Sequence, residues 1–304
     1  MTSPSPIALF TYKRLDTLNQ SLNSLKKCPE APLSDLIIIA DYPATDKDVD
    51  KVESVRKFLT TITGFKSIEI IEREKNYGVD YNIIEGIKMM AARFPQFIVV
   101  EDDLVVKKEF LSFLNKALNK YKNQEKVISV SAFSYLNNIP KDYLFDVYFA
   151  KRTNPWGWAT WSNKINAVDW ELSDKEEFII NTKIQNKFNE WGSDRSRMLI
   201  KTIQNKIKAW DIRLDYDQFK NNTTTVYPTI SLVENIGFGN EDASNTFGYN
   251  RFKTKKTANQ IDINQIRFSE VIIYNNKICK EFINKNSVAQ RIITKVMKAI
   301  KYKN

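Results

Sequence analysis

Three consecutive carboxylates, Glu101-Asp102-Asp103, directly follow the apolar run Phe97–Val100. This run is rich in β-branched residues, which is typical of a buried parallel strand. In open α/β sheets ligands bind at the carboxyl ends of the strands, and three acids placed there repel one another unless a cation joins them. Mn²⁺ or Mg²⁺ carrying phosphate oxygens would satisfy this requirement, because both metals bind carboxylate, water and phosphate. The alternative interpretation is a solvated acidic turn after a strand.

Polar residues follow the other predicted strands in the same way. The strands and the residues after them are Ile7–Phe10 with Thr11 and Arg14, Leu36–Ala40 with Asp41, and Ser67–Glu72 with Asn76 and Gly78. Because the strand tips of a parallel sheet face one crevice, these side chains would meet. Asp41 can accept a hydrogen bond from a base or a ribose hydroxyl, and Arg14 can pair with a diphosphate. Each residue alone resembles an ordinary loop residue, but in this order they fit a nucleotide-diphosphate site.

The elements that would position these residues alternate between strand and helix. Helices are predicted from an N-cap at Asp16 to Leu25, over Asp46–Thr60, after Gly78 and over Glu109–Lys120, and a further strand over Val127–Ser131. This alternation indicates an α/β protein with a doubly wound, mostly parallel sheet. We expect one domain over residues 1–285, with a ligand-binding half at 1–145 and an acceptor half at 146–285. Few strands are expected between residues 222 and 250.

Composition narrows the possible chemistry. The chain has 304 residues, a net charge of +10 and no histidine. Without histidine, Ser-His-Asp, Cys-His and His-ligated metal mechanisms are excluded, so catalysis would depend on carboxylates, tyrosines, lysines or a carboxylate-bound metal. The positive charge suggests an acidic partner such as a nucleotide, nucleic acid or anionic lipid. Cys28 and Cys279 are expected to be free thiols in a reducing cytoplasm, and no apolar run has membrane-spanning length.

The sequence pattern of residues 286–304 predicts a basic amphipathic helix. Its apolar stripe consists of Val288, Ile292, Ile293, Val296, Met297 and Ile300. Its basic residues are Arg291, Lys295, Lys298, Lys301 and Lys303, which lie off this stripe. Such a helix can lie on an anionic membrane surface. It can equally pack on the core with its lysines in water, and the sequence leaves both possibilities open.

The ordered set of motifs resembles a GT-A-fold glycosyltransferase. The first motifs are Phe10-Thr11-Tyr12-Lys13-Arg14, the strand before Asp41, Asn76-Tyr77-Gly78 and Val99-Val100-Glu101-Asp102-Asp103. The similarity continues at Arg-Thr-Asn-Pro-Trp-Gly-Trp-Ala-Thr-Trp (152–161), at Ala209-Trp210-Asp211 and at residues 227–237. The chain is particularly similar to the N-acetylglucosaminyltransferase group of glycosyltransferase family 13, and also to bacterial surface-polysaccharide glycosyltransferases. The resemblance spans about residues 6–250.

This resemblance implies roles for the matching residues. Asp103 would bind Mn²⁺ or Mg²⁺, Asp102 would contact the ribose or the donor sugar, and Glu101 would orient the neighbouring groups. Asp41 would recognise the nucleobase, and Arg14 the nucleotide or its phosphates. The other donor-site residues would be Thr11, Asn76, Gly78, Trp156, Gly157, Trp158 and Trp210.

The resemblance also implies that Asp211 is the general base of an inverting reaction. Asp215 is a second candidate, because the two residues share a face at i, i+4 if the segment is helical. Asp211 can instead be a helix N-terminal acid favoured by the macrodipole. Tryptophans stack on sugars but are also frequent core residues, and we expect at least one of Trp156, Trp158 and Trp161 to face the cleft. At residues 243–246 the sequence departs from bacterial relatives that often carry a histidine there.

The resulting expectation is a metal-dependent, inverting glycosyltransferase of bacterial surface-polysaccharide synthesis. It would move a sugar from a nucleotide sugar, a UDP-sugar first, to a glycan or lipid-linked acceptor, in the cytoplasm or bound to the inner face of the membrane. One alternative is a sugar-phosphate nucleotidyltransferase, although none of the eight glycines lies at residues 11–20. Another is a non-catalytic membrane or nucleic-acid binder. No nucleic-acid-binding signature is present, so we expect no nucleic-acid partner.

Overall fold

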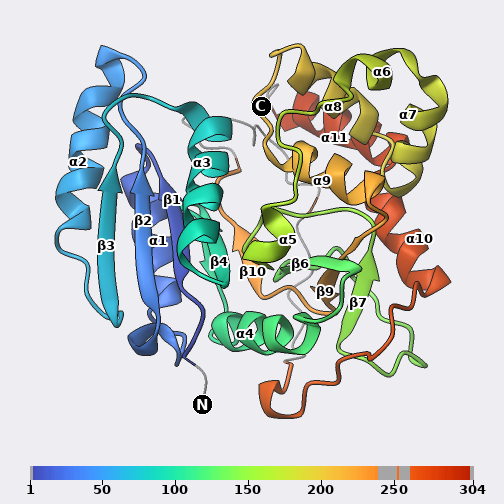
Figure 1. The fold of residues 1–304 in the computed structure, drawn as a ribbon, viewed down its shortest axis with the longest axis horizontal. Helices are drawn as coiled ribbons and strands as arrows, with labels where there is room; N and C mark the ends of the chain where they lie inside the picture. The colour runs from blue at the N-terminus through green and yellow to red at the C-terminus, as the bar shows by residue number, and fades with distance from the viewer. Residues whose placement is uncertain (1–2, 239–251, 253–260, 302–304) are drawn as a thin grey trace.

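The computed structural model describes residues 3–238, 252 and 261–301 (Figure 1). Residues 243–246, where the sequence lacks the histidine that bacterial relatives often carry, lie outside the described residues. The described residues form an eight-stranded sheet in the order β3-β2-β1-β4-β8-β6-β9-β7. Its first four strands are parallel: β3 (Ser67–Glu72), β2 (Asp35–Ala40), β1 (Ile7–Thr11) and β4 (Gln96–Glu101). The expected α/β fold with a mostly parallel sheet is therefore confirmed.

The same sheet continues into the C-terminal half. β8 (Trp158–Trp161) is antiparallel to both of its neighbours, β4 and β6 (Val127–Ser131). β9 (Thr224–Pro228) is parallel to β6, and β7 (Val147–Ala150) is antiparallel to β9. A second sheet pairs β5 (Leu104–Val106) with β10 (Val233–Asn235).

The expectation of few strands after residue 222 was wrong at β9 and β10. All five residues of β9 are buried, although two of them are threonines. Their hydroxyls are satisfied inside the protein, because Thr224 Oγ1 donates to Ala150 O at 2.9 Å and Thr225 Oγ1 donates to Gln218 Oε1 at 2.8 Å. A β-branched residue with a satisfied hydroxyl fits a buried strand.

Helices cover both faces of the large sheet. One apolar cluster joins the sheet to α1 (Leu15–Leu25), α2 (Val49–Leu59) and α4 (Phe110–Tyr121). A second cluster on the opposite face joins it to α3 (Gly78–Arg93), α5 (Ser162–Ile165) and α9 (Asp211–Lys220). A third cluster packs α6 (Lys175–Ile180), α7 (Thr182–Phe188) and α8 (Arg195–Ile203) against α9. The short 3₁₀ helices are Ala31–Leu33, Asp46–Asp48, Asn189–Trp191 and Ile263–Gln265.

The ends of two predicted helices differ from the structure. α1 is preceded by Arg14 and begins at Leu15, so Asp16 lies in the first turn and was wrongly expected to be the N-cap. A carboxylate in the first turn still favours the helix through the macrodipole. The helix expected from Asp46 begins as a 3₁₀ turn and becomes α-helical at Val49.

The C-terminal region contains α10 (Asn276–Lys285) and α11 (Val288–Lys301), and α11 lies within the segment 286–304 where a basic amphipathic helix was expected. Within the described part of the chain, none of the helices combines the length and the apolar character that crossing a bilayer would require.

The carboxyl ends of β1, β2 and β4 lie at one edge of the large sheet, as expected. The parallel register pairs Thr11 with Ala40 and Phe10 with Glu101. The buried apolar run Phe97–Val100 anchors β4 in the sheet interior, so Glu101 emerges at its tip. The polar residues after these strands are thereby brought together.

Candidate active site

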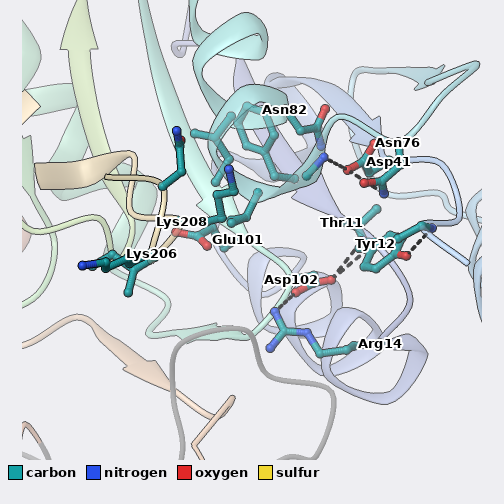
Figure 2. A pocket seen from close by; sticks show the side chains of 17 residues that line it. Thr11, Tyr12, Arg14, Asp41, Asn76, Asn82, Glu101, Asp102, Lys206 and Lys208 are labelled. Atoms are coloured by element: carbon teal, nitrogen blue, oxygen red, sulfur yellow. Dashed lines mark hydrogen bonds and ion pairs between the residues drawn. The ribbon is translucent and has the colours of Figure 1, made fainter. Parts of the chain in front are cut away.

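A pocket with a volume of about 490 Å³ lies at this edge of the sheet. Seven predicted donor-site residues line it: Thr11, Arg14, Asp41, Asn76, Gly78, Glu101 and Asp102. Figure 2 shows the side chains of Thr11, Arg14, Asp41, Asn76, Glu101 and Asp102, which come from the tips of β1, β2 and β4 and from the loop before α3. Pockets of this volume hold small organic ligands and cofactors.

Asp41 holds the loop at the start of α3. Its Oδ1 accepts from Tyr77 N at 2.9 Å, and its Oδ2 accepts from Gly78 N at 2.9 Å and from Asn76 Nδ2 at 3.4 Å. Gly78 has φ = +70°, a left-handed conformation that glycine adopts without steric cost. Asp41 is 4% exposed, so in this structure its carboxylate shapes the pocket wall through the backbone of the loop.

Asp102 is fixed between β1 and Arg14. Its Oδ2 accepts from Thr11 Oγ1 at 3.0 Å and from Tyr12 N at 3.3 Å, and its Oδ1 forms an ion pair with Arg14 Nη2. Asp102 is buried, whereas Glu101 beside it is partly exposed at the pocket. The two neighbouring carboxylates therefore have different surroundings.

Asp103 does not line this pocket. Its Oδ2 pairs with Arg14 Nη1 at 3.0 Å, and its Oδ1 accepts from Asn235 Nδ2 at 3.3 Å. Gly237 lies so close that a Cβ at this position would collide with the Asp103 carboxylate. Asp103 is 6% exposed and is enclosed by Arg14 on one side and by the segment after β10 on the other.

Negative charge accumulates around Arg14. Burial raises the pKa of Glu101 well above its ordinary value, and the charges of Asp103, Asp102 and Asp211 raise it further. Burial also raises the pKa of Asp103, and the charge of Asp102 adds to this effect while Arg14 opposes it. One guanidinium therefore faces several carboxylates, so an additional cation would be favoured here.

The donor set fits a divalent cation that is bound together with phosphate. In the described ranges, no group of three or more acids or cysteines is arranged to hold a metal without help. Mg²⁺ is usually bound by one or two carboxylates, with phosphate and water as its other ligands. Asp103 and Asp102 can supply these one or two carboxylate ligands, and the excess negative charge beside Arg14 favours binding of a divalent cation.

Asp211 is the first residue of α9 and is partly exposed. Burial raises its pKa to about 6, and the charges of Asp215 and Asp80 contribute to the same shift. The charge of Asp211 also raises the pKa of Glu101, although Asp211 is not among the described residues that line the pocket. Its place in the first turn also agrees with the alternative interpretation of a helix N-terminal acid.

Asp215 lies one turn further along α9 in a buried ion pair. Its Oδ2 accepts from Arg195 Nε at 2.7 Å, and its Oδ1 accepts from Arg195 Nη2 at 3.0 Å and from Thr153 N at 2.9 Å. The residue is 2% exposed. Both oxygens are engaged in anchoring α9 to α8 and to residue 153, an arrangement that does not suit a base.

The tryptophans pack in the interior. Trp158 and Trp210 stack with ring centroids 5.6 Å apart, and both are buried, as is Trp161. Trp156 is partly buried against Phe133, with centroids 4.8 Å apart. Among the described lining residues of the pocket there is no tryptophan, so the expectation of one at the cleft is not met there.

The reason is the pairing of β8. Val99 of β4 lies opposite Trp158, which places this indole between the sheet and the helices on its α3 face. Gly157 precedes the strand and packs its backbone against the ring of Phe110, where a Cβ would come within 2.6 Å of a ring carbon.

Lys206 and Lys208 line the pocket but were not expected from the sequence. They come from the turn between α8 and α9, and Figure 2 shows them on the side opposite Asp41 and Asn76. The signal that could have found them is the run Asn-Lys-Ile-Lys (205–208), which ends two residues before Trp210. Two lysines so close to a Trp-Asp element place positive charge near the site.

Comparison with known proteins identifies the family. Residues 7–175, more than half of the chain, match the family described as Glycosyl transferase family 2. The chain belongs to this family. The mostly parallel sheet with helices on both faces is the GT-A, Rossmann-like fold that was expected for this family 2 glycosyltransferase. The finer similarity to family 13 stays a prediction.

Solved structures resemble the family 2 glycosyltransferase distantly. S. aureus TarS matches with a TM-score of 0.39 at 13% identity, over 75% of this chain and 37% of its own length. The mannosyltransferase PcManGT from Pyrobaculum calidifontis, in complex with GDP-Man and Mn²⁺, matches with a TM-score of 0.36 at 11% identity. That match covers 53% of this chain and 45% of PcManGT. No curated protein matches the chain.

Proposed function

We propose that this family 2 glycosyltransferase moves a sugar from a nucleotide-sugar donor to a glycan or lipid-linked acceptor in bacterial surface-polysaccharide synthesis. A UDP-sugar is the first candidate donor. The observation that supports this proposal is the pocket of about 490 Å³ at the strand edge, which is lined by the acids Glu101 and Asp102 and by Lys206 and Lys208 on the side opposite Asp41 and Asn76. Acids and cations in one pocket suit a ligand with hydroxyl groups at one end and a diphosphate at the other.

The cations of the pocket would bind the diphosphate. Lys206 and Lys208 stand on one wall, and Arg14 stands beside Asp102 on the other. Arg14 is shared between two carboxylates, and the two lysines add positive charge to the lining of the same pocket. The loop held by Asp41 would approach the nucleoside through its backbone, at Asn76 and Gly78.

Asp102, which lines the pocket, and Asp103, which lies outside the lining and is joined to Asp102 through Arg14, would together hold Mn²⁺ or Mg²⁺ with the diphosphate. A metal bound there would supply Lewis-acid stabilisation of the leaving diphosphate. Arg14 keeps both carboxylates in place through its two ion pairs.

Asp211 would act as the general base. It would accept the proton of the acceptor hydroxyl as this group attacks the anomeric carbon from the side opposite the diphosphate, which inverts the configuration. A pKa of about 6 leaves this carboxyl mostly ionised at neutral pH while keeping its basicity above that of an ordinary aspartate. The buried ion pair of Asp215 with Arg195 favours Asp211 over Asp215 for this role.

The two halves of the domain would divide the substrates between them. Residues 1–145 would bind the nucleotide sugar and residues 146–285 the acceptor, with Lys206 and Lys208 reaching across from the acceptor half. We place the enzyme in the cytoplasm or at the inner face of the membrane.

The test is calorimetric titration of UDP into the protein with Mn²⁺ and with EDTA. Three variants accompany the wild type: Asp103→Asn, the double variant Lys206→Ala/Lys208→Ala, and the control Asp142→Asn, whose side chain is 77% exposed. We expect Mn²⁺-dependent binding that is lost in Asp103→Asn, weakened in the lysine variant and kept in the control. Turnover of UDP-sugars, with the product anomer assigned by NMR, then tests transfer and inversion.

Two other outcomes are informative. Binding of GDP, CMP or dTDP in place of UDP changes the donor and keeps the site. Failure of every nucleotide to bind a folded wild-type protein, as judged by its thermal unfolding, would remove the proposal.

A further inference from the structure

The apolar side of α11 faces solvent. Val288, Ile292, Ile293 and Val296 are 51%, 56%, 47% and 52% exposed. Their positions i, i+4, i+5 and i+8 place them on one stripe of the helix. Exposed apolar residues are ordinary when they are scattered singly, but a contiguous stripe marks a surface that something covers.

The polar side of the same helix is attached to the body of the protein. Arg291 Nη2 donates to Ser193 Oγ at 3.0 Å, and Ser193 N and Oγ donate to Asn286 O at 3.2 and 3.1 Å. Asn286 and Phe282, just before α11, are completely buried. The start of the helix is therefore fixed with a polar residue inward and the apolar stripe outward, the reverse of a helix that packs on a core.

The charge of α11 has one sign. Val288–Lys301 contains Arg291, Lys295, Lys298 and Lys301 and no acid (Figure 1, red). In the helical register, position 291 and the lysine positions 295, 298 and 301 all lie outside the arc of the apolar stripe, and position 295 lies next to its edge at 288. Basic residues beside an apolar stripe are the arrangement by which a helix lies in the interface of an anionic membrane.

We propose that α11 docks this protein onto an anionic lipid surface, with the four exposed apolar side chains at the acyl boundary and the basic residues at the headgroups. A second copy of the chain is a poorer occupant, because two such helices would bring two sets of like charges together without an acid to pair them. The docking does not depend on the proposed transfer reaction. Its consequence, delivery of the enzyme to a lipid-linked acceptor, rests on the proposed function.

The experiment is co-sedimentation of the full-length protein with vesicles, without donor or acceptor. The vesicles are phosphatidylcholine alone and phosphatidylcholine mixed with phosphatidylglycerol. The variants are Ile292→Asp/Ile293→Asp, Lys295→Gln/Lys298→Gln, and the control Leu144→Asp, at a leucine that is 67% exposed outside α11. Thermal unfolding checks that each variant is folded.

We expect the wild type and the control to bind the anionic vesicles and to bind neutral vesicles much less. The double aspartate variant should lose binding. The double glutamine variant should bind roughly 25-fold more weakly, because each basic residue near an anionic surface contributes about fivefold in affinity.

Three results would overturn the proposal. The first is that the wild type does not bind anionic vesicles, and the second is that the double aspartate variant binds them as well as the wild type does. The third is that the wild type is a dimer which the double aspartate variant converts to a monomer, while neither form binds lipid. Since no nucleotide sugar is present, failure here is separate from failure of the proposed transfer reaction.

Discussion

Replacing Asp211 with asparagine should reduce activity and increase stability at the same time. The ordinary pKa of this carboxyl is 3.8, and burial raises it to about 6 in the folded protein. The difference corresponds to ~3 kcal/mol that ionised Asp211 costs the folded state. A general base contributes roughly 10²- to 10⁴-fold to the rate, so kcat of Asp211→Asn should fall by that factor.

The sign of the stability effect follows from the direction of the pKa shift. Because the folded pKa is raised, the contribution of protonated Asp211 to stability is complete below about pH 4 and is lost as pH rises through about 6. An asparagine is never ionised and keeps that contribution. Asp211→Asn should therefore be more stable than the wild type at pH 8, by up to ~3 kcal/mol, and similar to it at pH 4.

Two assays test this reasoning. Urea unfolding of wild type, Asp211→Asn and the exposed control Asp142→Asn at pH 4, 6 and 8 measures stability. The pH dependence of kcat/KM for sugar transfer should fall tenfold per pH unit below about 6 in the wild type and should be flat in Asp211→Asn. The assignment of Asp211 as a general base with a raised pKa would be refuted if kcat of Asp211→Asn fell by less than tenfold. It would also be refuted if wild type and Asp211→Asn had equal free energies of unfolding at pH 8.

Three further changes have expected outcomes. Lys206→Ala/Lys208→Ala should weaken UDP binding about 100-fold or more in calorimetry, since two charged hydrogen-bond donors, each contributing about 1.5–3 kcal/mol, leave the pocket; unchanged affinity would place the diphosphate elsewhere. Gly237→Ala should lower the free energy of unfolding by ~1–3 kcal/mol in urea, because the added methyl group collides with the carboxylate of Asp103; wild-type stability would contradict that contact. Asp215→Asn should cost ~3–5 kcal/mol by the same measurement, because it leaves a buried guanidinium uncompensated; a loss under 1 kcal/mol would contradict its anchoring role.

Local sequence patterns were sufficient for the N-terminal half of the sheet. The apolar runs before Thr11, Asp41 and Glu101 are long enough and rich enough in β-branched residues to identify buried strands. The parallel register then follows from the alternation with helices, and it brings the strand tips to one pocket. The sequence therefore predicted the walls of the site on the side of β1, β2 and β4.

The pairing of β5 with β10, the engagement of Asp215 and the pocket wall that carries Lys206 and Lys208 depend on tertiary contacts, which local sequence patterns do not contain. β5 and β10 have three residues each, too few for a periodic signal, and they pair across more than 120 positions of the chain. The engagement of Asp215 depends on Arg195, which is 20 residues away in another helix. Lys206 and Lys208 enter the pocket because α8 and α9 pack together at a turn, so no strand-tip rule could locate them.

The antiparallel strand β8 also determines how this enzyme can move. Its backbone ladder joins β4 to β6 without interruption, so the two halves of the molecule share one sheet. A hinge between them would have to break a continuous set of interstrand hydrogen bonds, which makes rigid-body closure of one half upon the other costly. Adjustment to substrates then belongs to segments outside the sheet. The turn that carries Lys206 and Lys208 is such a segment, because it lines the pocket and lies outside the strands of the sheet.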